Sequence, residues 1–249
     1  MAVRTTTVQI PNGDLRIEAY FAQPEGDGPF PGILVIQEVF GVNAHIRDVT
    51  ERIAAEGYLA IAPALYQRTA PGFDVGYDDA ALAEGRKYKD MTTAAELLSD
   101  LAAAIAYLQN TWGQQLKHRP NGKPALGSIG FCFGGHVAYL AATLPALHVT
   151  ASFYGAGIAT MTPGGGEPTI ARTPEIQGTL YACFGTEDPL IPNEQVDAVE
   201  QALQLNDSNH RVFRYQGAGH GFFCDRRDSY RADAAADAWE QVKALFEQL

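Results

Sequence analysis

The chain has little basic charge, and this shortage argues against one class of partner. Only 18 of its 249 residues are Lys or Arg, against 29 Asp or Glu, so the formal net charge at pH 7 is −11. A surface with this excess of negative charge repels phosphate backbones, and no short basic run offsets the excess locally. Nucleic acid is therefore not an expected partner.

Long apolar runs are also missing. No apolar stretch approaches the ~20 residues that a helix needs to cross a bilayer. The first fifteen residues, MAVRTTTVQIPNGDL, lack the apolar core of a secretory signal. We therefore expect no membrane association and a cytoplasmic location.

Cysteine is scarce, and its spacing is uninformative about disulfides or metals. Cys132, Cys183 and Cys224 are odd in number and far apart, which is neither a disulfide framework nor a zinc-binding pattern. Cys132 and His136 have a spacing that could share a metal, but no further ligands follow at metal spacing. We expect no metal and no cofactor, and each cysteine is then either a core residue or a reactive thiol.

What the sequence does have is a regular alternation of short apolar runs and helical periodicities. Its hydrophobic content of 46% is that of an ordinary globular protein. No repeat or linker divides it, so we expect one domain over residues 1–249. Expected strands are residues 8–10, 15–21, 33–36, 58–62, 126–130, 149–154, 180–184 and 212–215. Expected helices are residues 44–56, 93–110, 193–203 and 230–248, with another beginning near 134.

This alternation predicts an α/β fold with a mostly parallel central sheet and helices on both faces. Residues 67–91 are polar and are expected to form a loop and a short helix. Residues 155–178 contain three consecutive glycines and are expected to form a long surface loop. Of the other histidines, His45, His118, His148 and His210 lack a chemical context, and we expect them at the surface or at helix ends.

One motif carries chemistry. Gly130-Phe131-Cys132-Phe133-Gly134 lies after an expected buried strand and before an expected helix, which is the pattern Gly-x-nucleophile-x-Gly of a nucleophile elbow. The turn holds the nucleophile in a strained backbone conformation, and glycines on either side let neighbouring backbone pass. The backbone N–H of Phe133 is then a candidate donor to an oxyanion.

An acid and a base follow in a suitable order. Asp188 comes after the expected strand 180–184, and His220 lies in a glycine-rich loop after the strand 212–215. The order nucleophile, acid, histidine is typical of the α/β-hydrolase fold. We expect His220 to be the base and Asp188 to orient it, although Glu187 could be the acid instead.

These residues resemble the dienelactone hydrolase (carboxymethylenebutenolidase) family over nearly the whole chain. The similar stretches are residues 37–43 (QEVFGVN), 62–66 (APALY), 70–72 (APG), 154–155 (YG) and 219–222 (GHGF). The resemblance implies a hydrolase of small carboxylic esters or lactones, with no cofactor. It also implies a triad of Cys132, Asp188 and His220.

The resemblance implies further roles near the triad. Val39 matches a second oxyanion donor through its backbone N–H, and Glu38 matches a glutamate that contacts the resting thiol. Expected substrate-binding residues are Phe40, Arg86, Tyr88, Tyr154, Phe222 and Cys224. Two arginines hold a substrate carboxylate in the family, and Leu82 and Cys224 stand at the matching positions of this sequence. The nearby candidates to replace them are Arg86, Arg226 and Arg227.

Two alternatives stay open. The chain could be a non-catalytic member of the fold that keeps a ligand pocket, or a thiol hydrolase acting on other electrophiles such as activated phosphoesters. An elbow specifies a nucleophile and not its target. No pattern encodes the oligomeric state, and we expect a monomer or a homodimer.

Overall fold

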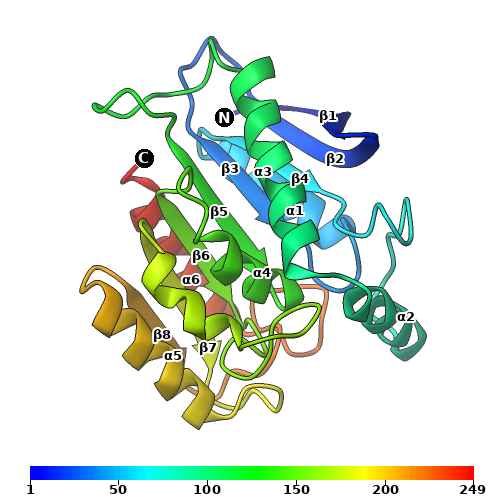
Figure 1. Cartoon of the computed structure of the whole chain (residues 1–249), viewed down its shortest axis with the longest axis vertical. Coiled ribbons are helices and arrows are strands. Elements are labelled where there is room, and N and C mark those ends of the chain that lie inside the picture. The colour runs from blue at the N-terminus through cyan, green and yellow to red at the C-terminus, as the bar shows by residue number, and fades with distance from the viewer.

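The computed structural model describes all residues, 1–249, around one eight-stranded sheet (Figure 1). The strand order is β1-β2-β4-β3-β5-β6-β7-β8. The strands are β1 (Val3–Asn12), β2 (Leu15–Pro24), β3 (Gly32–Ile36), β4 (Leu59–Pro63), β5 (Leu126–Phe131), β6 (Val149–Phe153), β7 (Thr179–Gly185) and β8 (Arg211–Tyr215). The helices are α1 (Ala44–Ala55), α2 (Asp79–Asp90), α3 (Ala94–Thr111), α4 (Phe133–Ala141), the 3-10 helix η1 (Thr169–Glu175), α5 (Asn193–Asn206) and α6 (Ala232–Phe246).

The sheet is mostly parallel, as predicted, with an antiparallel edge. β1 and β2 form a hairpin in which Asn12 pairs with Leu15, so the turn is the two residues Gly13 and Asp14. Gly13 has φ +59°, a conformation that glycine adopts without a Cβ penalty. β2 also pairs antiparallel with β4, and every later pairing is parallel.

The central strands are covered on both faces. Every residue of β3, β4, β5 and β6 is buried, and β3 and β4 accordingly contain no polar side chain. Along β3, Ile33 and Val35 pack into the same core cluster as α1 and α6. Leu34 and Ile36 pack on the other side, with α3 and part of α4.

The chain order changes direction at β3, and this creates the natural place for a site. After β3 the chain crosses to β4 on one side, and later returns to β5 on the other side of β3. Ligands of open parallel sheets bind at such a switch point, beyond the carboxyl ends of the strands. The segments that follow β3 and β5 therefore face the expected site.

Two segments are more ordered than the sequence predicts. The region 67–91 contains the twelve-residue helix α2, in which only Ala81 and Gly85 are buried. The region 155–178 contains η1, whose hydroxyls reach the interior: Thr169 lies 2.7 Å from His136 Nε2, and Thr173 lies 2.5 Å from a tyrosine hydroxyl of α4. The long loop is thus anchored to α4 rather than lying free on the surface.

Helix α3 begins as its sequence predicts. The Thr93 hydroxyl accepts a hydrogen bond from the Glu96 backbone N–H and donates one to the Glu96 carboxylate, a form of the capping box.

No single helix in the structure is long and apolar enough to cross a membrane. Helices α2 and α3 meet the length and composition criteria only as a pair, and they are bent by 94° relative to each other.

Candidate active site

The nucleophile elbow is visible in the backbone. Cys132 lies between β5 and α4 with φ +56° and ψ −118°, a region that costs a non-glycine residue on the order of 1–3 kcal/mol. A Cβ on Gly130 would lie 1.9 Å from the Gly134 carbonyl oxygen, and a Cβ on Gly134 would lie 2.3 Å from the Ile36 oxygen. Both glycines are therefore required by close packing around the strained residue.

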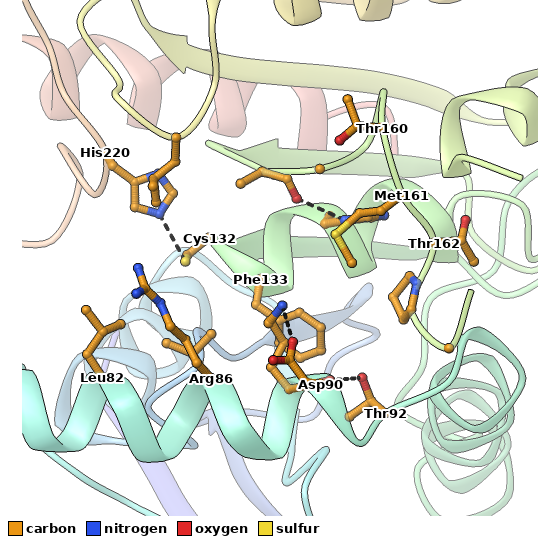
Figure 2. Close-up of a pocket in the computed structure, with 18 of the residues that line it drawn as sticks. Leu82, Arg86, Asp90, Thr92, Cys132, Phe133, Thr160, Met161, Thr162 and His220 are labelled. Carbon is orange, nitrogen blue, oxygen red and sulfur yellow. Dashed lines mark hydrogen bonds and ion pairs between the residues drawn. The ribbon is translucent and has the colours of Figure 1, made fainter. Parts of the chain in front are cut away.

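Three side chains from three segments meet at this elbow. His220 Nε2 lies 3.0 Å from Cys132 Sγ, and His220 Nδ1 lies 2.8 Å from Asp188 Oδ2 (Figure 2 shows the contact between His220 and Cys132). The Leu190 backbone N–H donates to the other carboxylate oxygen of Asp188 at 2.8 Å. Glu187 is exposed, so Asp188 is the acid that reaches the imidazole.

The imidazole sits among charges that favour its protonated form. Burial lowers the pKa of His220, but the neighbouring Cys132 sulfur and Asp188 carboxylate raise it more, and the pKa is raised to about 10. A histidine with this pKa readily accepts the thiol proton. The contact with Cys132 and the raised pKa of the imidazole both suit His220 as a base.

Val39 and Phe133, the two candidate oxyanion donors, line the cavity together with Cys132. Phe133 is the first residue of α4, where N–H groups have no acceptor within the helix. Val39 follows β3, and its carbonyl is held against α2, since a Cβ on Gly85 would lie 2.2 Å from the Val39 oxygen. Val39 and Phe133 both line the same cavity as Cys132, an arrangement suited to holding an oxyanion.

Glu38 has a different contact from the one expected. Its carboxylate is fully buried, accepts a hydrogen bond from the Tyr77 hydroxyl at 2.8 Å and pairs with Arg227 Nη1 at 3.2 Å. The thiol of Cys132 hydrogen-bonds with His220 instead. A guanidinium and a phenol are much stronger donors than a thiol, so Glu38 holds Arg227 at the cavity wall in this structure.

The cavity above Cys132 has a volume of about 790 Å³, within the range of small-molecule sites. It is walled by the segment after β3, by α2, by the elbow and by the loop 156–165 (Figure 2). Of the expected substrate-binding residues, Phe40 and Arg86 line it. Arg227, one of the candidates to replace a family arginine, lines it too, and so does Leu82. Arg226 is exposed outside it.

Four expected substrate-binding residues lie outside the cavity. Tyr88 packs against two aromatic rings beside α2. Tyr154 and Phe222 are fully buried, and the Tyr154 ring packs edge-on against His220 with centroids 5.2 Å apart. Cys224 is also buried, with its thiol directed to a tyrosine hydroxyl at 3.3 Å. Phe222 and Cys224 are buried because the chain turns into the core after His220, and Tyr154 packs behind the imidazole.

The sequence reasoning missed several lining residues. On α2 the lining set includes Lys89 and Asp90, which pair with each other at 2.6 Å. The loop contributes Met161 and its neighbours, and Gly164 and Gly165 have φ of +84° and +92°. The α2 residues 82, 86, 89 and 90 follow the spacing of one helical stripe, so a helix assigned to this segment could have revealed them.

A second group of polar side chains is buried outside the cavity lining. Glu38, His45 and Cys224 offer ligand atoms that all lie within 4.8 Å of one another. His45 lies at a helix end, as one of its two expected placements had it, but it is buried, with 1% exposure, and burial lowers its pKa. Burial, followed by the charge of Glu38, raises the pKa of the Cys224 thiol to about 11.

The strand order, the elbow at the switch point and the histidine–carboxylate pair define an α/β-hydrolase. The model of the dienelactone hydrolase family matches residues 17–249. The chain is 57% identical over 246 residues to a protein of Synechocystis sp. named "Putative carboxymethylenebutenolidase", covering 98% of this chain and 97% of the relative. The chain therefore belongs to the dienelactone hydrolase family and is a dienelactone hydrolase-like hydrolase.

Solved structures agree with this assignment. A crystal structure described as a "Putative Dienelactone Hydrolase" from Klebsiella pneumoniae matches with a TM-score of 0.86 and 30% identity, over all of both chains. A dienelactone hydrolase-like promiscuous phosphotriesterase from metagenomic libraries matches with a TM-score of 0.80 and 26% identity, over all of this chain and 99% of the other. The α/β-hydrolase fold expected from the sequence is thus confirmed.

Proposed function

We propose that this protein hydrolyses small carboxylic esters or lactones through an acyl-cysteine intermediate on Cys132. The observation that carries the proposal is the continuous contact from Cys132 Sγ to His220 (3.0 Å) and from His220 to Asp188 (2.8 Å). The name carboxymethylenebutenolidase, borne by the Synechocystis relative, supports an ester or lactone as the substrate class.

In the first half-reaction the sulfur of Cys132 attacks the substrate carbonyl carbon while His220 holds the thiol proton. The N–H groups of Val39 and Phe133 stabilise the resulting oxyanion, each contributing ~3 kcal/mol to the lowered barrier. When the intermediate collapses, the C–O bond to the leaving group breaks and His220 gives its proton to the departing oxygen. In a lactone the leaving oxygen remains attached to the acyl group.

In the second half-reaction His220 accepts a proton from water as the water oxygen attacks the acyl carbon. The C–S bond then breaks, the carboxylic acid is released and His220 returns its proton to the sulfur, which restores Cys132. Asp188 keeps the imidazole oriented and stabilises its positive charge through both halves. No metal or cofactor takes part in these steps.

The charges of the cavity favour a substrate that bears a carboxylate. Arg86 projects from α2 into the cavity (Figure 2), and it makes no ion pair, whereas Lys89 is neutralised by Asp90. Arg227 is held by Glu38 through one nitrogen, Nη1, so its remaining N–H groups are available to a ligand. Arginine pairs with carboxylates through two parallel hydrogen bonds.

The test compares the unmodified protein with Cys132→Ala on a panel of p-nitrophenyl esters and a dienelactone. We expect the alanine variant to lose more than ~1000-fold in kcat/KM. A slow ester should leave an acyl group on Cys132, detected by mass spectrometry of the intact protein. Cys183→Ala is the matched control, since that thiol is buried inside β7 away from the cavity. Equal activity of Cys132→Ala and the unmodified protein would refute the nucleophile.

A second candidate is hydrolysis of activated phosphoesters, favoured by the likeness to the promiscuous phosphotriesterase. Cys132 would then form an S–P bond as the aryloxide leaves, and water would break that bond. Diethyl p-nitrophenyl phosphate in the same assay separates the two candidates: turnover faster than that of every carboxylic ester favours the second. A ligand-binding protein without catalysis would turn over neither class.

The three free thiols fit a reducing compartment, and we propose that the protein acts in the cytoplasm. We also propose that it is a monomer or a homodimer. Light scattering coupled to size-exclusion chromatography measures the mass of the assembly directly, and any mass above that of a dimer would contradict this proposal.

A further inference from the structure

A buried polar cluster adjoins Arg227, which pairs with one of its members. It contains Glu38, which follows β3, His45 near the start of α1, and Cys224, which lies beyond the catalytic histidine in the chain. Their exposures are 0%, 1% and 0%. One carboxylate oxygen, one ring nitrogen and one sulfur lie within 4.8 Å of one another.

His45 has hydrogen-bonding capacity that the protein does not use. Neither Nδ1 nor Nε2 has a partner, and both atoms are buried. A neutral imidazole carries one N–H and one lone pair, and leaving a buried polar group unpaired is unfavourable. The rings of Phe131 and Phe223 contact the imidazole edge-on, with centroids 5.7 and 6.3 Å away, so the ring is fixed by packing while its nitrogens remain free.

The hydroxyl of Tyr154 is a second buried group without a partner. The Tyr154 ring packs against Phe131, with centroids 6.3 Å apart, and Phe131 is the ring that contacts His45. Burial raises the pKa of Tyr154, and the charges of Glu38 and Cys224 raise it further. Native interiors rarely leave several polar groups unpaired in one place. The unpaired nitrogens of His45, beside Glu38 and Cys224, indicate an occupant that the chain itself does not supply.

We propose that Glu38, His45 and Cys224 bind a divalent transition-metal ion of the zinc class. Carboxylate oxygen, imidazole nitrogen and thiolate sulfur are all zinc ligands, and a thiolate selects against Mg²⁺ and Ca²⁺. The carboxylate and the thiolate supply two negative charges to a site whose carboxylate also pairs with Arg227.

The spacing of the ligand atoms is compatible with this ion. Bond lengths of roughly 2.0–2.3 Å place the ligand atoms of a tetrahedral site about 3.5 Å apart. The atoms here lie within 4.8 Å of one another, so side-chain shifts of about 1 Å close the site. Each carboxylate oxygen has a second lone pair, so Glu38 can bind the ion while it still accepts from Tyr77. Three protein ligands leave the fourth position to water.

The experiment uses Co²⁺ as a spectroscopic probe of the site in the full-length Cys132→Ala protein. Removing the nucleophile leaves Cys183 and Cys224 as the only thiols, and it makes the result independent of hydrolysis. We expect one Co²⁺ per chain, with a thiolate-to-metal charge-transfer band in the near ultraviolet. Zn²⁺ should displace the Co²⁺ and abolish the band.

Variants in this background decide which thiol is the ligand. Cys132→Ala/Cys224→Ala should lose the band and bind Zn²⁺ more than about 100-fold more weakly. Cys132→Ala/Cys183→Ala is the matched control, because both cysteines are fully buried, and it should keep the band. Circular dichroism verifies the fold of each variant, and His45→Phe, which keeps an aromatic ring among its aromatic neighbours, is the second ligand variant.

Absence of the band in Cys132→Ala would overturn the proposal. The proposal would also fail if the band persisted without Cys224, or if His45→Phe bound Zn²⁺ as tightly as its parent. In each of these cases the proposed hydrolysis by Cys132 would be unaffected, since it is measured with esters on the unmodified protein.

Discussion

Replacing Asp188 by asparagine should impair the enzyme more than replacing it by alanine. Both carboxylate oxygens are in use: one accepts from His220 Nδ1 and the other from the backbone N–H of Leu190. An amide offers one acceptor and one donor. The N–H of Leu190 is a fixed donor, so the amide oxygen turns toward Leu190 and the NH₂ group toward His220. Nδ1 must then be an acceptor, and the imidazole presents Nε2–H to the sulfur and cannot take its proton.

The expected magnitudes differ accordingly. Asp188→Ala removes a hydrogen bond to a charged group, worth ~1.5–3 kcal/mol, which lowers kcat/KM by about 10- to 150-fold. Asp188→Asn also imposes the wrong tautomer on His220, and the loss should approach roughly 10⁴-fold. The two variants therefore separate an electrostatic contribution of Asp188 from its control of the tautomer.

The assay is kcat/KM for a p-nitrophenyl ester, measured from roughly pH 6 to 10, the range in which a histidine base titrates. Glu187→Gln is the matched control, because Glu187 adjoins Asp188 in sequence but is exposed, and its activity should stay within twofold of the unmodified protein. Thermal melts verify that the variants are folded. If Asp188→Asn were more active than Asp188→Ala, the reasoning about Leu190 would be wrong.

Three other changes test the site and its scaffold. Arg86→Leu should raise KM for esters that carry a carboxylate by ~10-fold and leave KM for neutral esters unchanged. Lys87→Leu, at an exposed neighbouring position, should change neither KM. An equal rise in KM for neutral esters would contradict a charge interaction with Arg86. Gly130→Ala should lower the free energy of unfolding by about 3 kcal/mol or more, because its Cβ would lie 1.9 Å from a carbonyl oxygen. Gly76→Ala, which meets nothing within 4 Å, should change that free energy by less than about 0.5 kcal/mol in denaturant titrations. The pKa of His220 is raised to about 10 in the folded protein. The stabilisation from its protonated form is therefore complete below pH ~6.5 and is lost as the pH rises toward 10. Melting temperatures that rose across this window would refute the raised pKa of His220.

The strands were predictable because their signal is local. A strand buried on both faces is typically a continuous apolar run, and β3 and β4 satisfy this description residue by residue. β5, β6 and β7 are mostly apolar but include polar side chains such as Ser128, Thr150 and Thr179. Helix α2 was underestimated because only two of its residues are buried. Its remaining surface faces solvent or the cavity, so no apolar periodicity distinguishes the helix from a polar loop.

The residues that line the cavity were harder to predict, because the orientation of each helix in the fold decides which of its side chains reach the cavity. Tyr88 and Arg86 are two positions apart on α2, and residues at that spacing face different sides of a helix. Arg86 lines the cavity and Tyr88 does not. Leu82 and Lys89 share the stripe of Arg86, at the spacings i−4 and i+3. The side of α2 that faces the elbow depends on the fold, which composition alone does not reveal.

Glu38 shows why a motif can place a residue and still leave its role open. Its position after β3 follows from the sequence, but its partners Arg227 and Tyr77 come from segments far along the chain. The Glu38 carboxylate pairs with Arg227 at the cavity wall and also has an oxygen within 4.8 Å of ligand atoms of His45 and Cys224. A substrate carboxylate that binds the remaining N–H groups of Arg227 shares the guanidinium with Glu38 and weakens the Glu38–Arg227 pair. The strength of the Glu38–Arg227 pair therefore links ligand binding in the cavity to the buried cluster, and measuring Zn²⁺ affinity with and without a carboxylate ligand would reveal this coupling as a reciprocal change in both affinities.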